Sequence, residues 1–226
     1  MTTIESSDFK SVLDAAFVRD GDPATLVFDN YLRWKGTPEY LIRPAAPEDG
    51  QPSSVSDNFA VLCYPANELF TTFCTLGASR QIVPGSPASF GDPRGVRYEY
   101  IMHAPQPHEH AIAELLVLIA EHPYNHAIEV GPGFILPIGE PVVPGSGMEY
   151  LYYTYPYLDD PQIYEQPYGQ IERPQLMIQT LWVFPIYRSE VQFIRRNGPD
   201  AWETRLQEHH SEIYDAYEFL RNPLVN

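Results

Sequence analysis

The sequence has few basic residues and no long apolar run. Lysine occurs only at Lys10 and Lys35, and 14 Lys and Arg stand against 30 Asp and Glu, so the formal net charge is -16. A chain this acidic has no long-range attraction for phosphate backbones or anionic lipid. No apolar run approaches the roughly 20 residues that a membrane-spanning helix needs. The composition therefore disfavours unaided binding to nucleic acid or to a membrane, and leaves a basic partner or plain solubility as the use of the charge.

Cysteine is scarce, and the N-terminus carries no export pattern. Residues 1–10 lack a basic region followed by an apolar stretch, so we expect no secretory signal and a cytoplasmic protein. Cys63 and Cys74 lie in apolar, strand-like runs, and we interpret them as buried thiols. A disulfide or a cysteine nucleophile is the less favoured alternative, because the sequence shows no environment that would lower a thiol pKa.

Familiar catalytic motifs are also missing. There is no G-x-S-x-G elbow, no Gly-rich phosphate loop with Lys and no H-E-x-x-H, and these motifs carry the common hydrolase, nucleotide and zinc chemistries. We therefore expect no enzyme, no catalytic residue, no metal and no cofactor. The competing hypothesis is a small metal-dependent hydrolase that uses the region of His103, His108 and His110. A general scaffold or regulatory protein is a third hypothesis.

Hydrophobic patterning predicts an α/β fold of the α+β type, in which helices flank a mixed β-sheet. Residues 1–43 are interpreted as an N-terminal extension with a short helix from Ser7 to about Gly21, packed on a domain of residues 44–226. The Pro- and Ser-rich passage 43–57 reads as the loop between them. Strands are expected at 58–64, 69–76, 96–102, 134–138, 148–153 and 177–186, and later helices at 108–122, 189–196 and 199–221.

The segment 108–122 is the strongest predicted helix. Its polar strip consists of His110, Glu114 and Glu121, and the remaining positions are almost all Ala, Ile, Leu or Val. We expect such a helix to be buried on most sides. Pro123 is expected to end it, which would remove the helical i, i+4 geometry from the pair His122 and His126.

The negative charge is concentrated in one stretch, residues 98–172, which we call the cation-free segment. It contains no Lys or Arg and eleven of the carboxylates, and seven of the 16 tyrosines fall between Tyr150 and Tyr168. Strand alternation would expose one side of Tyr150–Tyr155, and exposed Tyr beside Asp and Glu suits protein recognition. The alternative is a Tyr-rich strand packed under its own loop, with Asp159 and Asp160 at a solvated tip. The predicted partner-binding residues are Tyr155, Tyr157, Asp159, Asp160, Tyr164, Glu165 and Tyr168.

Four short motifs follow one another along the chain. The run Phe59–Tyr64 is followed by Phe70–Ser79 (FTTFCTLGAS), then by Tyr98-Glu99 and the apolar helix 111–120. Pro144-Gly145-Ser146 precedes Leu181–Ile186 (LWVFPI) with Glu190, and Gly198–Ala201 extends the last motif. In this order and spacing, the motifs over about residues 40–210 resemble the suppressor of fused (SUFU) domain.

The resemblance implies a SUFU-like single domain that binds protein and is not an enzyme. Animal members repress signalling by sequestering a transcription factor, partly by adding the partner's strand to a sheet edge. Bacterial stand-alone members are regarded as immunity proteins that neutralise toxins, and this chain resembles that type because it lacks the second domain of the animal proteins. We therefore expect a cytoplasmic immunity protein whose partner is a protein such as a basic nuclease toxin. Thr75, Gly77 and Ser79 match the family pattern and are interpreted as shaping a turn.

Overall fold

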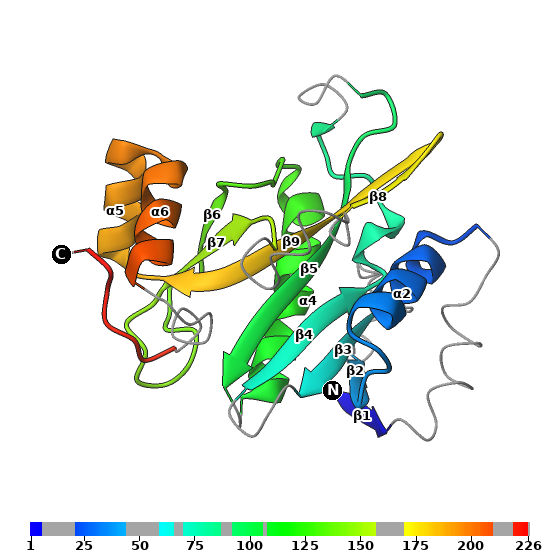
Figure 1. Cartoon of the computed structure of the whole chain (residues 1–226), viewed down its shortest axis with the longest axis horizontal. Coiled ribbons are helices and arrows are strands. Elements are labelled where there is room, and N and C mark those ends of the chain that lie inside the picture. The colour runs from blue at the N-terminus through cyan, green and yellow to red at the C-terminus, as the bar shows by residue number, and fades with distance from the viewer. Residues whose placement is uncertain are drawn as a thin grey trace.

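A mixed nine-stranded sheet forms the centre of the molecule (Figure 1). The computed structural model describes residues 1–5, 21–43, 59–65, 70–86, 92–105, 108–156, 170–209 and 219–225. The strand order is β1-β2-β3-β4-β5-β9-β7-β6, with β8 also paired to β9. The strands are β1 (Thr2–Glu5), β2 (Tyr40–Arg43), β3 (Ala60–Pro65), β4 (Phe70–Leu76), β5 (Arg97–Pro105), β6 (Ile135–Pro137), β7 (Tyr150–Thr154), β8 (Gln170–Arg173) and β9 (Leu176–Ile186).

The long strand β9 joins the two halves of the sheet. It runs parallel to β5, with Ile178 beside Arg97 and Trp182 beside Ile101, whereas all other strand pairs are antiparallel. Ile178 also pairs with Ile171 of β8, and Trp182 also pairs with Thr154 of β7. Because β5 occupies one side of β9, β8 and β7 must follow one another along its other side. The predicted mixed sheet is confirmed.

Four α-helices of the described residues cover the sheet in two layers (Figure 1). Buried residues of α4 pack with one face of the strands, and those of α2, α5 and α6 pack with the opposite face. No described helix combines the length and the apolar character that crossing a bilayer requires. The helices are α2 (Pro23–Trp34), α4 (Glu109–His126), α5 (Arg188–Asn197) and α6 (Pro199–His209).

The central strands are buried on both faces. Residues Ala60–Tyr64 of β3 are all buried, as the continuous apolar run predicts. The expected exposed side of Tyr150–Tyr155 is wrong for β7, because Tyr152 and Tyr153 are both fully buried. The strand lies between β9 and β6 in the sheet, and both of its faces are covered. Tyr153 packs in the α4 layer, and Tyr152 contacts Trp202 of α6 on the other face. Tyr155, one residue past the strand, is 42% exposed.

The helix α4 differs from its prediction in two ways. Pro123 does not end it: the helix continues to His126 and closes where Ala127 adopts φ 51° and Ile128 N–H donates to Pro123 O over 3.0 Å. The buried Pro123 lies within a turn that this left-handed cap closes. The helix is also buried on one face only, with Leu118 49% exposed. One face is enough because α4 is a single layer packed on β4 and β5.

Several predictions fall on residues outside the described ranges. These are the helix from Ser7 to about Gly21, the loop passage from residue 44 to 57 and residues 210–218 of the last predicted helix. The described part of that helix is α6, and Phe219–Val225 are not helical. The division at residue 43 stays a prediction, and β1 and β2 from the first part extend the same sheet.

Candidate functional site

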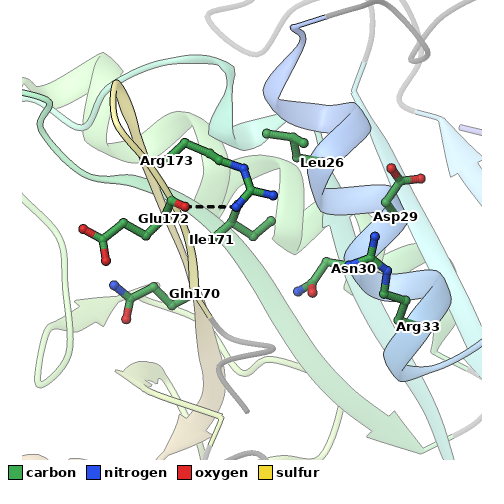
Figure 2. A pocket seen from close by; sticks show the side chains of 8 residues that line it. All are labelled: Leu26, Asp29, Asn30, Arg33, Gln170, Ile171, Glu172 and Arg173. Atoms are coloured by element: carbon green, nitrogen blue, oxygen red, sulfur yellow. Dashed lines mark hydrogen bonds between the residues drawn. The ribbon is translucent and has the colours of Figure 1, made fainter.

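A polar groove of about 400 Å³ lies between α2 and the β8–β9 hairpin (Figure 2). Helix α2 forms one wall and β8 the other. The guanidinium group of Arg173 extends from β8 towards the helix. The lining residues are Leu26, Asp29, Asn30, Arg33, Gln170, Ile171, Glu172 and Arg173.

The first wall is placed by the N-terminus of α2. Asp22 caps the helix by accepting a hydrogen bond from Ala24 N–H at 2.9 Å, and Pro23 occupies the first helical position. Arg80 fastens this cap, because its Nε and Nη2 both donate to Asp22 Oδ2 at 3.0 and 2.9 Å. Ala24, Val27 and Tyr31 are buried against the sheet. Asp29 and Arg33 therefore lie exposed on the groove side.

The second wall is the edge strand β8. It pairs with Leu176–Gln179 of β9 across the turn at Pro174-Gln175, and no other described strand pairs with it. Arg94 fastens the hairpin by donating to Glu172 Oε1 at 2.9 Å and to the Arg173 carbonyl at 2.8 Å. Only Ile171 of the strand is partly buried, against the α2 layer. Among the described residues, no strand covers the outer edge of β8, where the Glu172 carbonyl accepts from Arg173 Nη1 at 3.2 Å. This edge and a groove with both signs of charge suit an extended polypeptide.

Of the predicted partner-binding residues, the structure describes Tyr155, whose side chain is partly exposed. Tyr157, Asp159, Asp160, Tyr164, Glu165 and Tyr168 lie outside the described residues. After β7 the described residues end at Pro156, and they resume at Gln170, the first residue of β8. The predicted segment is therefore continuous in sequence with one wall of the groove.

Sequence reasoning missed both walls of the groove. The signal for α2 was present, since Asp22-Pro23 is a capping pair and the buried positions 24, 27 and 31 share a helical face. Strand β8 has four residues, and Ile171 is its only apolar residue. Its pairing depends on β9, so periodicity alone had little to detect.

The histidines of the hydrolase hypothesis do not form a site. His103 is buried, with its Nδ1 2.9 Å from Thr72 Oγ1 and its ring edge-on to Trp182. His108 precedes α4, and His110 is exposed in its first turn. Within the described ranges no three His, Cys, Asp or Glu side chains group as metal ligands do.

His122 and His126 are close together because α4 continues past Pro123. Their ring centroids are 4.5 Å apart. Burial, and then the charge of His126, lowers the pKa of His122.

Both cysteines are buried free thiols, as predicted. Burial raises the pKa of the Cys63 thiol. A thiolate nucleophile there is disfavoured.

The motif residues Thr75, Gly77 and Ser79 converge on one buried carboxylate. Glu99 accepts hydrogen bonds from the hydroxyls of Thr75 and Ser79, each at 2.6 Å, and from the N–H groups of Gly77 and Ser79, each at 3.0 Å. Burial raises the pKa of Glu99, and these hydrogen bonds oppose the rise. Gly77 has φ 106°, a conformation that favours glycine. The turn directs its N–H groups at Glu99, and the carboxylate in turn holds the turn in place.

A second buried carboxylate, Glu190, belongs to the last motif. It accepts from Arg221 Nη1 at 2.7 Å and Nη2 at 2.9 Å, from Leu224 N–H at 3.1 Å, and from Tyr187 N–H at 2.7 Å at the start of α5. Glu190 is fully buried and Arg221 is 6% exposed. The pair ties the C-terminal residues to α5, and neither buried carboxylate faces the groove.

The sheet and its two helix layers form a single α/β domain. A family model described as suppressor of fused protein (SUFU) matches residues 56–216. The chain therefore belongs to the SUFU family, and the predicted SUFU-like mixed fold is confirmed.

Solved structures show the same fold. A SUFU homologue from Neisseria gonorrhoeae FA 1090 is 18% identical, with a TM-score of 0.64 over 92% of this chain and 98% of that one. A structure of the Sufu–Fu complex is 12% identical, with a TM-score of 0.64 over 89% and 91%. Drosophila Suppressor of Fused is 12% identical, with a TM-score of 0.61 over 92% of this chain and 52% of that one. No curated protein matches.

Proposed function

We propose that this protein is a non-catalytic module that sequesters a protein partner, whose extended chain docks along β8 beside the α2 groove. The observation that carries the proposal is the outer edge of β8, which no other described strand covers, next to a groove lined from two elements. Membership of the SUFU family supports protein binding, because one solved structure of the fold is a complex, that of Sufu with Fu. A sheet edge binds an extended chain through its backbone groups, and neighbouring side chains add specificity.

The finer form of the proposal is a cytoplasmic bacterial immunity protein that neutralises a basic toxin, such as a nuclease. Its support is the cation-free segment, which supplies eleven carboxylates and runs directly into β8. Several of these carboxylates lie on or beside α4, where Glu109, Glu114 and Glu121 retain solvent exposure. Complementary charge speeds association with a basic surface, and Tyr side chains add contact area.

Neutralising the predicted acidic site is expected to weaken partner binding at low salt. The change is Asp159→Asn, Asp160→Asn and Glu165→Gln together, and the measurement is the affinity for a co-purified partner across a salt series. Three charge contacts at about 0.5 kcal/mol each correspond to about a tenfold loss of affinity. The salt slope should also decrease. Glu208→Gln, an exposed acid outside the cation-free segment, is the control, and an unchanged affinity with an unchanged slope for the triple variant contradicts the acidic docking site.

Proline at Gln170 is expected to weaken binding without weakening the fold. A two-residue hairpin turn closes on a hydrogen-bonded pair, here Arg173 and Leu176, so we expect alternate residues Gln170 and Glu172 to face the open edge. Gln170→Pro then removes an edge N–H at the first residue of a strand, where proline is tolerated. The expected loss of affinity is about tenfold, from one hydrogen bond and the steric block.

The matched control for this variant is Gln170→Ala, which shortens the same side chain and keeps the N–H. Partner affinity, measured by calorimetry at two salt concentrations, should fall for proline alone and by the same factor at both. Equal affinity for the two variants, with equal melting temperatures, rules out docking at this edge and leaves the acidic segment as the binding surface.

A further inference from the structure

A second groove, of about 520 Å³, lies on the opposite face of the sheet from α2. It runs between α4 and the end strand β6, and its wall on the β6 side consists of Leu136, Pro137 and Ile138. All of its lining residues fall within the cation-free segment. Its α4 wall carries two carboxylates, Glu114 and Glu121, and the histidine pair His122 and His126.

The histidine pair has the geometry of a helical chelate. His122 and His126 are four residues apart on one helix, so their side chains lie one turn above the other on the same face. With a metal–nitrogen bond of about 2 Å, an ion lies roughly 3 Å from the centre of each imidazole. If the nitrogen–metal–nitrogen angle is about 90°, the two ring centres lie about 4.5 Å apart. The observed separation of the ring centroids is 4.5 Å.

The end of α4 holds the pair in place. The left-handed cap at Ala127 and the hydrogen bond from Ile128 N–H to Pro123 O close the turn that carries both histidines. The His122 ring also lies 6.4 Å from the ring of Phe134, centroid to centroid, and His126 is exposed towards solvent. One imidazole is therefore packed and the other accessible, so an ion can reach the pair from solvent.

We propose that His122 and His126 bind one divalent late-transition-metal ion, Cu²⁺ or Ni²⁺, as a cis bidentate chelate. A nitrogen–metal–nitrogen angle near 90° suits the tetragonal geometry that these ions adopt with nitrogen and oxygen ligands. No third protein ligand converges among the described residues, so water fills the remaining positions. Glu114 and Glu121 in the same groove attract the cation. This site is independent of the proposed partner-binding edge.

The test is titration of the full chain with Cu²⁺ against a competing chelator. We expect one ion per chain, and imidazole nitrogen couplings in the Cu²⁺ electron paramagnetic resonance spectrum. His122→Ala and His126→Ala should each lower the affinity about tenfold or more, whereas His110→Ala, an exposed histidine at the other end of α4, should leave it unchanged. Ni²⁺ should bind more weakly than Cu²⁺, with the same order among the variants.

Two outcomes overturn the proposal. One is wild-type affinity equal to that of the His122→Ala/His126→Ala double variant. The other is an equal loss in His110→Ala, which would assign the ion to other histidines. His126 is exposed, so its variant keeps the test decisive if the His122 variant is poorly folded.

Discussion

Replacing Glu190 by alanine is expected to lower the free energy of unfolding by about 3–5 kcal/mol. The substitution leaves the guanidinium of Arg221 buried without its carboxylate, since both of its Nη groups donate to Glu190. It also removes the acceptor for the N–H groups of Tyr187 and Leu224. Urea unfolding at neutral pH measures the change. The C-terminal residues should become accessible to protease at the same time, because Glu190 is their anchor to α5.

Two further variants make this prediction specific. The pair of Arg188 and Glu149 is 3.9 Å apart and exposed, so Glu149→Ala should change stability by less than about 0.5 kcal/mol. Glu190→Leu combined with Arg221→Met removes both charges and should recover much of the loss, as apolar replacement of buried ion pairs does. A change below about 1 kcal/mol for Glu190→Ala would contradict the assignment of this pair as the C-terminal anchor.

Replacing Glu99 by alanine is the second substitution with a large expected effect, about 3 kcal/mol of unfolding free energy. Four donors from Thr75, Gly77 and Ser79 lose the carboxylate that accepts from them in a fully buried position. Glu99→Gln keeps one oxygen and should cost less than half as much. Urea unfolding compares both variants with Glu140→Ala, an exposed acid whose loss should be nearly neutral.

The pH dependence gives Glu99 a second signature. Burial raises its folded-state pKa above the ordinary value of 4.5, so the folded protein holds this proton to higher pH than the unfolded chain does. Its contribution to stability is therefore fully present below 4.5 and declines as pH rises through the folded pKa. As pH rises from 4.5 through the folded pKa of Glu99, the difference in unfolding free energy between wild type and Glu99→Gln should therefore shrink. A difference that grows with pH would mean that the hydrogen bonds outweigh burial.

Local sequence pattern predicted the strands well and the surroundings of α4 poorly. Strands β3, β4 and β9 are dense in β-branched and aromatic residues, so their type is decided locally. The apolar composition of α4 could not reveal that only one side would be covered, which leaves Leu118 half exposed. A proline usually ends a helix because it lacks the backbone N–H. In α4 the helix continues one turn past Pro123 and closes with the cap at Ala127.

The candidate site was less predictable than the fold, because its parts meet only in three dimensions. Arg94 reaches Glu172 and Arg80 reaches Asp22 from distant positions in the sequence. No spacing in the sequence indicates either ion pair. The two walls of the groove therefore come together only in the folded chain. Motif residues such as Ser79 were easier to recognise than to interpret, since their shared partner Glu99 lies 20 residues away.

The position of β9 in the sheet has a consequence for how the chain acquires its structure. β5 is complete at residue 105, yet the strand that pairs with its other side begins at residue 176. During synthesis β1 to β5 can assemble first, and β5 then presents an unprotected edge until β9 emerges. Pairing of β9 with β5 must also overcome the entropy of closing a long intervening segment, which makes folding slow for a chain of this size. The nascent chain is therefore most exposed to aggregation, and most in need of a chaperone, while residues 106–175 are being added.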